Sequence, residues 1–132
     1  MLRTALTLLL CLTSPVAMAA EMTCKRSPAL TGKCSTVKGS LGFTPGIGVT
    51  LVTEDGMRTI IKAPPDSNAD IASDVMQNWL YWQGQTGSMK TRIKGTYELC
   101  PLPPAINSAG IRDFGCINKG TRISEDKSST GS

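Results

Sequence analysis

The chain has 132 residues, with 14 lysines and arginines against 10 acidic residues, five cysteines and no histidine. This length allows one small domain. Without histidine, the chain cannot assemble a Ser-His-Asp triad, a Cys-His pair or a metal site with imidazole ligands. The net charge of +4 is ordinary for a protein surface and does not by itself indicate a nucleic-acid partner.

Residues 1–19 have the pattern of a cleaved export signal. Arg3 supplies the positive start, residues 5–12 form a short apolar run, and residues 17–19 read Ala-Met-Ala, the small-x-small motif that precedes cleavage. The apolar run is about half the roughly 20 residues that a membrane span requires, so we expect no membrane span in the mature chain. The sequence therefore predicts a periplasmic or secreted protein.

Four cysteines remain once the signal is removed: Cys24, Cys34, Cys100 and Cys116. An even number in an oxidising compartment predicts two disulfides. We expect Cys24 to pair with Cys34 and Cys100 with Cys116, because both bonds would be local and the second would join neighbouring strands. The spacing lacks the close cysteine pairs of a zinc site, so we expect no metal and no other cofactor.

The first half of the mature chain predicts three strands. Residues 34–43 fit a strand that Gly39 interrupts with a bulge or a strong bend. Residues 49–53 and 57–63 fit a hairpin around the Asp-Gly turn at residues 55–56.

A helix is predicted to begin at Ser67 or Asn68 and to end at Gly84. Apolar residues recur every four positions along it, which predicts one buried face. That apolar stripe consists of Ile71, Val75 and Trp79.

The second half predicts two strands and a tail. Residues 90–100 alternate with a period of two, with Tyr97 on the buried face, and the prolines that follow at 101–104 are expected to end this strand. Residues 111–123 fit a last strand. We expect a single domain over residues 20–123 and a disordered polar tail over residues 124–132.

Three strands, one helix and two strands is the order of elements in an OB-fold barrel, where the helix closes one end. We therefore expect a mainly β, disulfide-stabilised, OB-fold-like barrel of five strands. An α+β open antiparallel sheet with one helix is the alternative that the same order permits.

Residues 34–41 read Cys-Ser-Thr-Val-Lys-Gly-Ser-Leu, residues 95–102 read Gly-Thr-Tyr-Glu-Leu-Cys-Pro-Leu, and residues 116–117 read Cys-Ile. This pattern resembles a group of small exported bacterial proteins without assigned activity. The resemblance implies a shared scaffold of cysteines and glycines and no catalytic residue. The order of elements also resembles that of the glycan-binding B subunits of bacterial AB-type toxins, which are secreted OB-folds that form pentamers.

Five cations are candidates for a patch that binds phosphate, an acidic sugar or an anionic protein. They are Arg58, Lys62, Lys90, Arg92 and Lys94. The last three share one face of a predicted strand, and the first two share a face of another. The competing interpretation is a solvated strand face that its charges protect from pairing. A nucleic-acid partner is not expected, since few aromatic side chains interleave with these cations.

Trp79, Tyr81 and Trp82 cluster at the end of the predicted helix. Trp79 continues the apolar stripe, whereas Tyr81 and Trp82 are candidates for stacking on a sugar ring or packing on a partner protein. Asp70 and Asp74 stand four residues apart on the same predicted helix, the spacing that a carboxylate-based hydrolase would need for a paired site.

We therefore expect a non-enzymatic exported binding module that recognises a protein or an anionic or glycan ligand through the basic strand face or the aromatic helix end. An oligomeric glycan-binding subunit of a toxin-like assembly is the alternative. A carboxylate-based hydrolase is the candidate from another class.

Overall fold

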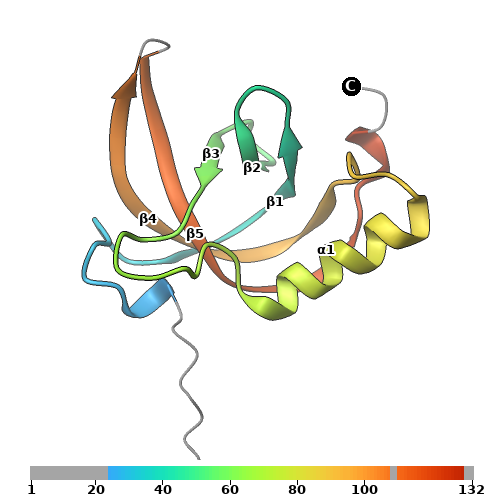
Figure 1. Ribbon diagram of the computed structural model, residues 1–132, viewed down its shortest axis with the longest axis horizontal. Coiled ribbons are helices and arrows are strands. Elements are labelled where there is room, and N and C mark those ends of the chain that lie inside the picture. Colours follow the sequence, from blue (N-terminus) through green and yellow to red (C-terminus); the bar gives the residue numbers. More distant parts are fainter. Residues whose placement is uncertain (1–23, 108–109, 130–132) are drawn as a thin grey trace, which may run out of the picture.

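The computed structural model describes residues 24–107 and 110–129 (Figure 1). The predicted export signal at residues 1–19 lies outside these residues. Among the described helices, none has both the length and the apolar composition that crossing a bilayer requires.

Five strands close into one barrel in the order β1-β2-β3-β5-β4. The strands are β1 (Ser35–Thr44), β2 (Gly48–Thr53), β3 (Arg58–Ile61), β4 (Ile93–Asn107) and β5 (Gly110–Glu125). β3 and β5 run parallel, and the other neighbouring strands run antiparallel. The helix α1 (Ser73–Thr86) lies between β3 and β4 in the chain and packs against β5.

This architecture confirms the predicted fold class: a mainly β, OB-fold-like barrel with one helix and two disulfides. Closure of the sheet excludes the open-sheet alternative. Two short 3-10 helices, η1 (Cys24–Arg26) and η2 (Lys127–Ser129), flank the barrel in sequence.

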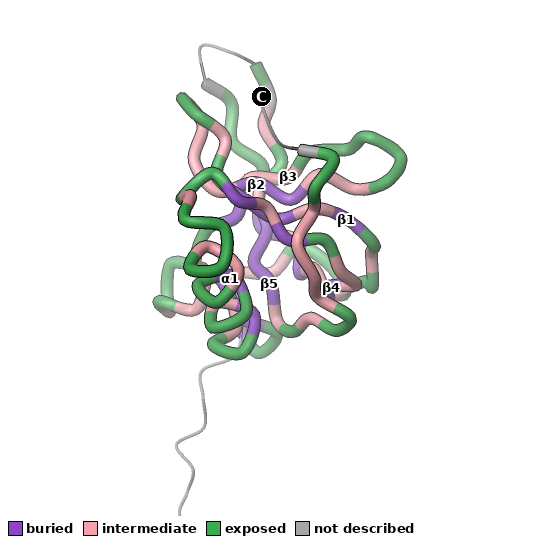
Figure 2. Tube along the Cα trace, turned by 90° about the vertical axis from the view of Figure 1, so that its right-hand side faces the viewer, coloured by how far each residue is buried: buried purple, intermediate pink, exposed green. Residues whose placement is uncertain are grey.

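The main core fills the barrel and the space beneath α1 (Figure 2). Its fully buried members include Leu41, Leu51, Ile93, Tyr97 and Val75. Among its buried members, Tyr97 and Trp79 carry a polar side-chain atom, and each of these atoms donates a hydrogen bond to a backbone carbonyl. The Tyr97 hydroxyl donates to the Ile93 carbonyl at 2.9 Å, and the Trp79 indole N–H donates to the Thr91 carbonyl at 2.9 Å. The predicted burial of Tyr97 and Trp79 is confirmed.

β1 closes the barrel by pairing with two strands at once. At Gly39 it lies opposite Thr53 of β2 and Gly95 of β4. A Cβ atom at Gly39 would lie 2.6 Å from the Val52 carbonyl oxygen, which is too close for any side chain. At the glycine that the sequence marks as a bend, a side chain would therefore collide with the backbone of β2.

The helix begins at Ser73, later than the predicted start at Ser67 or Asn68. The residues before it are extended and paired with β5 instead. Ile117 donates its N–H to the Asp70 carbonyl at 2.8 Å, and Ala72 donates to the Ile117 carbonyl at 2.9 Å. Backbone pairing with β5 thus outweighs the helical pattern over residues 70–72.

The helix also ends later than predicted. Gly84 lies inside α1, and the cap is Gly87, whose φ of 73° is the left-handed conformation that glycine adopts without strain. Gly87 donates its N–H to the Gln83 carbonyl at 2.8 Å, which closes the last turn.

β4 passes through the prolines that were expected to end it and continues to Asn107. Its ladder with β1 stops at Leu99, and beyond that point the Pro101 carbonyl accepts the Thr31 N–H at 3.0 Å without a described strand beside it on that edge. Proline is tolerated at such an edge, and Pro103 and Pro104 fall within a register shift between Leu102 and Ala105. In Figure 1 the distal parts of β4 and β5 rise beyond the barrel as a long hairpin.

The predicted disordered tail is ordered over part of its length. Residues 124–125 belong to β5, and η2 follows directly. The Asp126 N–H donates to the Arg92 carbonyl at 2.8 Å, which fixes this segment against the start of β4. Residues 130–132 lie outside the described part of the chain.

Both predicted disulfide pairings are wrong. Cys24 is bonded to Cys116 and Cys34 to Cys100, at sequence separations of 92 and 66 residues. The reason is topological: Ser35 of β1 lies opposite Leu99 of β4, which places Cys34 beside Cys100. A preference for local loops cannot anticipate this, because the neighbour of Cys34 is decided by barrel closure.

The two bonds lie in a second core cluster. It is formed by the buried residues Cys24, Cys100, Leu102 and Cys116, with Ala29, Leu30, Cys34, Ala69 and Phe114 packed around them. This sulfur cluster, as we call it from here on, joins the N-terminal segment 24–34 to β4 and β5. Long loops closed in this way restrict the unfolded chain strongly, by about 4 to 5 kcal/mol each in the chain-entropy description.

We predict opposite effects for two Gly→Ala substitutions. Gly39→Ala should destabilise the protein by about 1 to 3 kcal/mol, because the new methyl group meets backbone that cannot move freely. Gly84→Ala is the matched control and should stabilise it by up to about 1 kcal/mol, since the site lies within α1 and is open. Urea unfolding of both variants measures the difference, and equal effects would contradict the packing at Gly39.

The observed pairing is also directly testable, since trypsin separates all four cysteines. A digest without reductant should join residues 34–38 to residues 95–112, and residues 113–119 to the peptide that ends at Lys25. Mass spectrometry identifies the linked pairs. A link between residues 95–112 and 113–119 would contradict the structure.

Candidate functional site

A groove lies where the β1–β2 turn, the second half of α1 and the segment before β4 come together. Its volume is about 640 Å³. Its apolar walls are formed by Phe43, Pro45, Val52, Trp79 and Met89. Three cations line it as well: Arg58, Lys90 and Arg92. We call this site the cationic groove. A volume of this size suits a small organic ligand.

Arg92 is the most rigidly held of the three cations. Its Nε donates to the Ser40 hydroxyl at 3.0 Å, and its Nη2 donates to the Ser40 carbonyl at 2.7 Å and the Thr50 carbonyl at 3.0 Å. The side chain therefore lies across β1 and β2. The guanidinium also makes two longer hydrogen bonds, to the Thr44 and Thr50 hydroxyls.

Gly42 makes room for this arrangement. A Cβ atom at Gly42 would lie 2.4 Å from the Cγ atom of Arg92. Since Gly42 pairs with Thr50 in the β1–β2 ladder, the arginine crosses the sheet directly over this pair. The absence of a side chain at Gly42 allows the guanidinium to reach oxygens of both strands.

The five hydrogen bonds that the Arg92 guanidinium makes to the described residues end on neutral oxygens, and one of these acceptors, the Ser40 hydroxyl, also bonds to the Asp126 carboxylate. Burial lowers the pKa of Arg92, with the attraction of Asp126 acting in the opposite direction and the charge of Arg58 acting in the same direction as burial. The positive charge is thus only partly compensated within the chain. A half-buried charge in this condition favours an anion nearby.

The apolar walls include two large side chains that the fold leaves in water. Phe43 is 51% exposed and Met89 is 75% exposed. Trp79 forms the floor, with its indole N–H already bonded to the Thr91 carbonyl. The groove therefore combines fixed positive charge with uncovered apolar surface.

The structure brings together three of the five predicted cations. Lys62 lies apart from the groove, with its ammonium 4.5 Å from the centre of the Phe114 ring. Lys94 lies on another part of the barrel, where its positive charge stabilises the ionised carboxylate of Asp126. Burial opposes ionisation of Asp126, but hydrogen bonds from Ser128 and Ser40 and the charge of Lys94 outweigh burial and lower its pKa.

The predicted shared strand face for Lys90, Arg92 and Lys94 is therefore wrong. β4 begins only at Ile93, so the first two precede the strand and turn to the groove. Sequence reasoning also missed Phe43 and Met89 as groove residues. Met89 carried a signal, because a large apolar residue in a short loop beside Lys90 has no helical or strand pattern that would bury it.

At the aromatic helix end, Tyr81 and Trp82 contact each other and differ in burial. Trp82 is half-buried and packs against the main core, and Tyr81 is 54% exposed. Their rings meet edge to face, with centroids 5.1 Å apart. Neither residue lines the cationic groove, whereas Trp79, expected only in the core, does.

The paired-carboxylate site does not form. Asp70 lies before the helix, and its carboxylate accepts the Ile71 N–H at 2.8 Å. Asp74 lies in the first turn of α1, and its carboxylate accepts the Val75 N–H at 2.9 Å. Only one of the two residues is helical, so the spacing of four places no pair on a helix face.

A larger cavity, of about 920 Å³, lies at the other end of α1 between residues 65–74 and β5. Several of its polar side chains already bond to other side chains or to backbone. Asp66 accepts the Ser27 hydroxyl at 2.8 Å, and Asn118 bonds to both Lys25 and Glu98. These bonded groups are less available to a ligand than the cations of the cationic groove.

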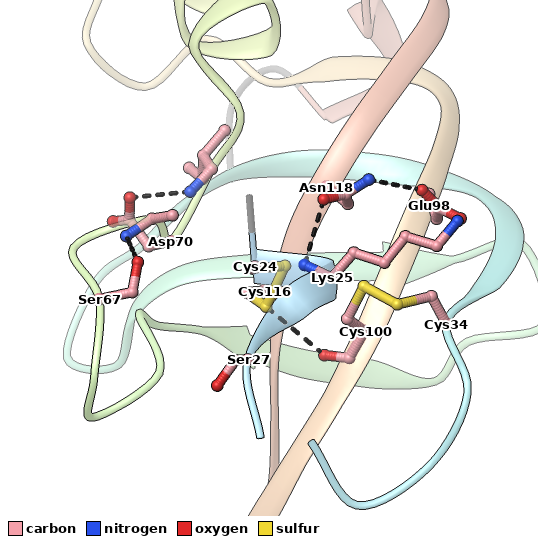
Figure 3. Close-up of a disulfide and its surroundings, with 12 residues drawn as sticks. Cys24, Lys25, Ser27, Cys34, Ser67, Asp70, Glu98, Cys100, Cys116 and Asn118 are labelled. Carbon is pink, nitrogen blue, oxygen red and sulfur yellow. Dashed lines mark hydrogen bonds and ion pairs between the residues drawn. A yellow bond between two sulfur atoms is a disulfide. The ribbon is translucent and has the colours of Figure 1, made fainter. Parts of the chain in front are cut away.

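The sulfur cluster lies beside that cavity (Figure 3). The sulfur atoms of Cys24, Cys100 and Cys116 lie within 4.8 Å of one another. Such a group can hold a metal only as thiolates, and all three sulfurs are bonded in disulfides. The cluster is therefore a covalent tie and not a metal site while both bonds stand.

An ion pair covers the sulfur cluster. The Lys25 ammonium lies 3.1 Å from the Glu98 carboxylate, whose other oxygen accepts the Asn118 amide at 2.7 Å (Figure 3). Burial opposes ionisation of Glu98, but these hydrogen bonds and the charges of Lys25 and Lys119 outweigh burial and lower its pKa. This network holds η1 against β4 and β5.

We predict that Glu98 contributes pH-dependent stability. Since the folded pKa of Glu98 is lowered, the contribution is complete above the unfolded value of about 4.3 and is lost as the pH falls through the folded value. Glu98→Gln should therefore be less stable than wild type at pH 7, and the gap should close in acid. Thermal melts from about pH 7 to pH 3 test this, with exposed Glu54→Gln as the control. A gap independent of pH would contradict it.

Comparisons of this chain with protein-family models, with curated proteins and with solved structures find no match. The resemblance to small exported proteins and to toxin B subunits therefore stays a prediction.

Proposed function

We propose that this chain is an exported, non-enzymatic binding module that holds an anionic ligand with an apolar body in the cationic groove. One observation carries the proposal: the hydrogen bonds that fix the half-buried Arg92 guanidinium at the groove end on neutral oxygens, and the Asp126 carboxylate acts on it only through Ser40 and at longer range. An anion bound there would supply the charge that the fold leaves partly uncompensated. Arg58 and Lys90 line the same groove and strengthen its positive potential.

The walls narrow the class of ligand. A wholly polar anion would leave Phe43 and Met89 as exposed as they are now, whereas an apolar ring or chain beside the anionic group would cover them. The glycan-binding alternative depends on the order of elements alone. The groove favours an amphiphilic anion over a neutral sugar.

Export is supported by the predicted signal at residues 1–19 and by the two disulfides, which persist in oxidising compartments. The non-enzymatic reading is supported by the separate roles of Asp70 and Asp74, each of which bonds to backbone N–H next to it. Binding a ligand in a preformed groove requires no catalytic side chain.

A fluorescent amphiphilic anion tests the proposal. Anilinonaphthalene sulfonate should bind the folded protein, and Arg58→Gln with Lys90→Gln should weaken its binding about tenfold, or about 1.4 kcal/mol, through the loss of two groove cations. Lys62→Gln with Lys94→Gln makes the same change in charge outside the groove and should leave the affinity unchanged. Fluorescence titration at low salt measures both.

Neutral N-phenylnaphthylamine separates charge from apolar contact. Its binding should be insensitive to both pairs of charge substitutions and should weaken with Phe43→Ala, because it keeps the rings and lacks the sulfonate. Equal losses of sulfonate affinity in the two charge variants, or no saturable binding by the folded protein, would refute the proposal.

A further inference from the structure

The two disulfides are close enough to exchange partners. The sulfur atoms of Cys24, Cys100 and Cys116 lie within 4.8 Å of one another, although they belong to two different bonds. Figure 3 shows both bonds in one view, close to η1. A thiolate on Cys100 would thus lie within 4.8 Å of both sulfurs of the other bond, so that a local side-chain movement suffices for contact.

The β4–β5 pairing also places Cys100 and Cys116 where a disulfide between them could form. Cys100 of β4 and Cys116 of β5 are direct register partners in the antiparallel ladder. Opposite residues in such a ladder have Cα atoms about 4.5 to 5.5 Å apart, within the range that a disulfide spans. The strands therefore hold Cys100 and Cys116 in position to bond to each other, yet each is bonded to the N-terminal segment.

The two existing bonds differ in accessibility. Cys24, Cys100 and Cys116 are at most 1% exposed, whereas Cys34 is half-buried at the start of β1. An external thiol can therefore reach the sulfur of Cys34 before any other. Attack at Cys34 makes Cys100 the leaving group, inside the sulfur cluster.

We propose that the sulfur cluster is a disulfide relay, in which reduction of Cys34–Cys100 by an external dithiol leads to a new Cys100–Cys116 bond and releases Cys24. This inference is independent of the cationic groove and of the ligand proposed for it.

The electrons and protons balance in three steps. A thiolate of the dithiol attacks Cys34, which forms a mixed disulfide and releases Cys100 as a thiolate. The second thiol of the reductant then attacks the mixed disulfide. The reductant departs as a disulfide, oxidised by two electrons, and Cys34 becomes a free thiol of the protein. The Cys100 thiolate attacks Cys116, and Cys24 departs as a thiolate that takes up a proton. The protein ends with one disulfide and two thiols.

The exchange would remove both covalent ties of the N-terminal segment and leave it held by hydrogen bonds and the Lys25–Glu98 ion pair. Residues 24–34 are tied to the barrel at both ends by Cys24 and Cys34, and the relay cuts both ties with one equivalent of reductant. Ala29 and Leu30 pack on the sulfur cluster in the oxidised form. Their release would uncover Leu102, which is now 4% exposed, while the β4–β5 ladder keeps a covalent tie.

Partial reduction of the mature chain, without residues 1–19, with dithiothreitol tests the relay. Free thiols are alkylated and located on tryptic peptides, which in this mature chain carry at most one cysteine each. The relay predicts that the species with two labels carries them on Cys24 and Cys34. Labels on Cys34 and Cys100, on Cys34 and Cys116, or on Cys24 and Cys116 would overturn it, as would direct passage from no labels to four.

Two single substitutions give an independent readout without reductant. Cys34→Ser leaves Cys100 unpaired beside the other bond, so the relay predicts a free thiol on Cys24 and a Cys100–Cys116 bond. Cys100→Ser is the matched control, because it leaves the free thiol on Cys34, outside the group of three close sulfurs. A free thiol that stays on Cys100 in folded Cys34→Ser protein would overturn the relay.

Discussion

The close approach of β1 and β2 at Gly39 is the constraint on which the rest of the structure depends. A Cβ at Gly39 would lie 2.6 Å from the Val52 carbonyl oxygen, so glycine lets β1 pair with β2 and β4 together without a collision. That double pairing closes the barrel. It also places the start of β4 beside the second half of β1, which lets Arg92 reach Ser40, and the start of β1 beside the middle of β4, which brings Cys34 to Cys100.

Local patterns in the sequence were sufficient for the elements and their order, and insufficient wherever another strand decided the outcome. The strand alternation around Tyr97 and the Asp-Gly hairpin depend on near neighbours, and both predictions agree with the structure. The helix start, the continuation of β4 past Pro104 and the disulfide partners of Cys34 and Cys24 depend on pairing across the barrel. No short-range pattern contains that information, because closure decides which distant residues become neighbours.

The candidate site was only partly predictable, for the same reason. Arg58, Lys90 and Arg92 were singled out by charge, and they do meet in one groove. The reason given for grouping them, a shared strand face, was wrong, and the same reasoning admitted Lys94, which lies near Asp126. Charge alone marks which residues attract anions. The apolar walls that make a groove come from three separate segments, and the sequence does not show that these segments meet.

Helix α1 connects the two sites that this fold builds. Its first turn borders the cavity beside Cys24, and its second half lines the cationic groove through Trp79 and Gln83. Between them Val75 is fully buried in the main core, which is distinct from the cluster that holds the sulfurs. Cleavage of the bonds to the N-terminal segment therefore removes contacts from one cluster and leaves the packing beneath the groove in place, so a ligand site can persist while the covalent ties are rearranged.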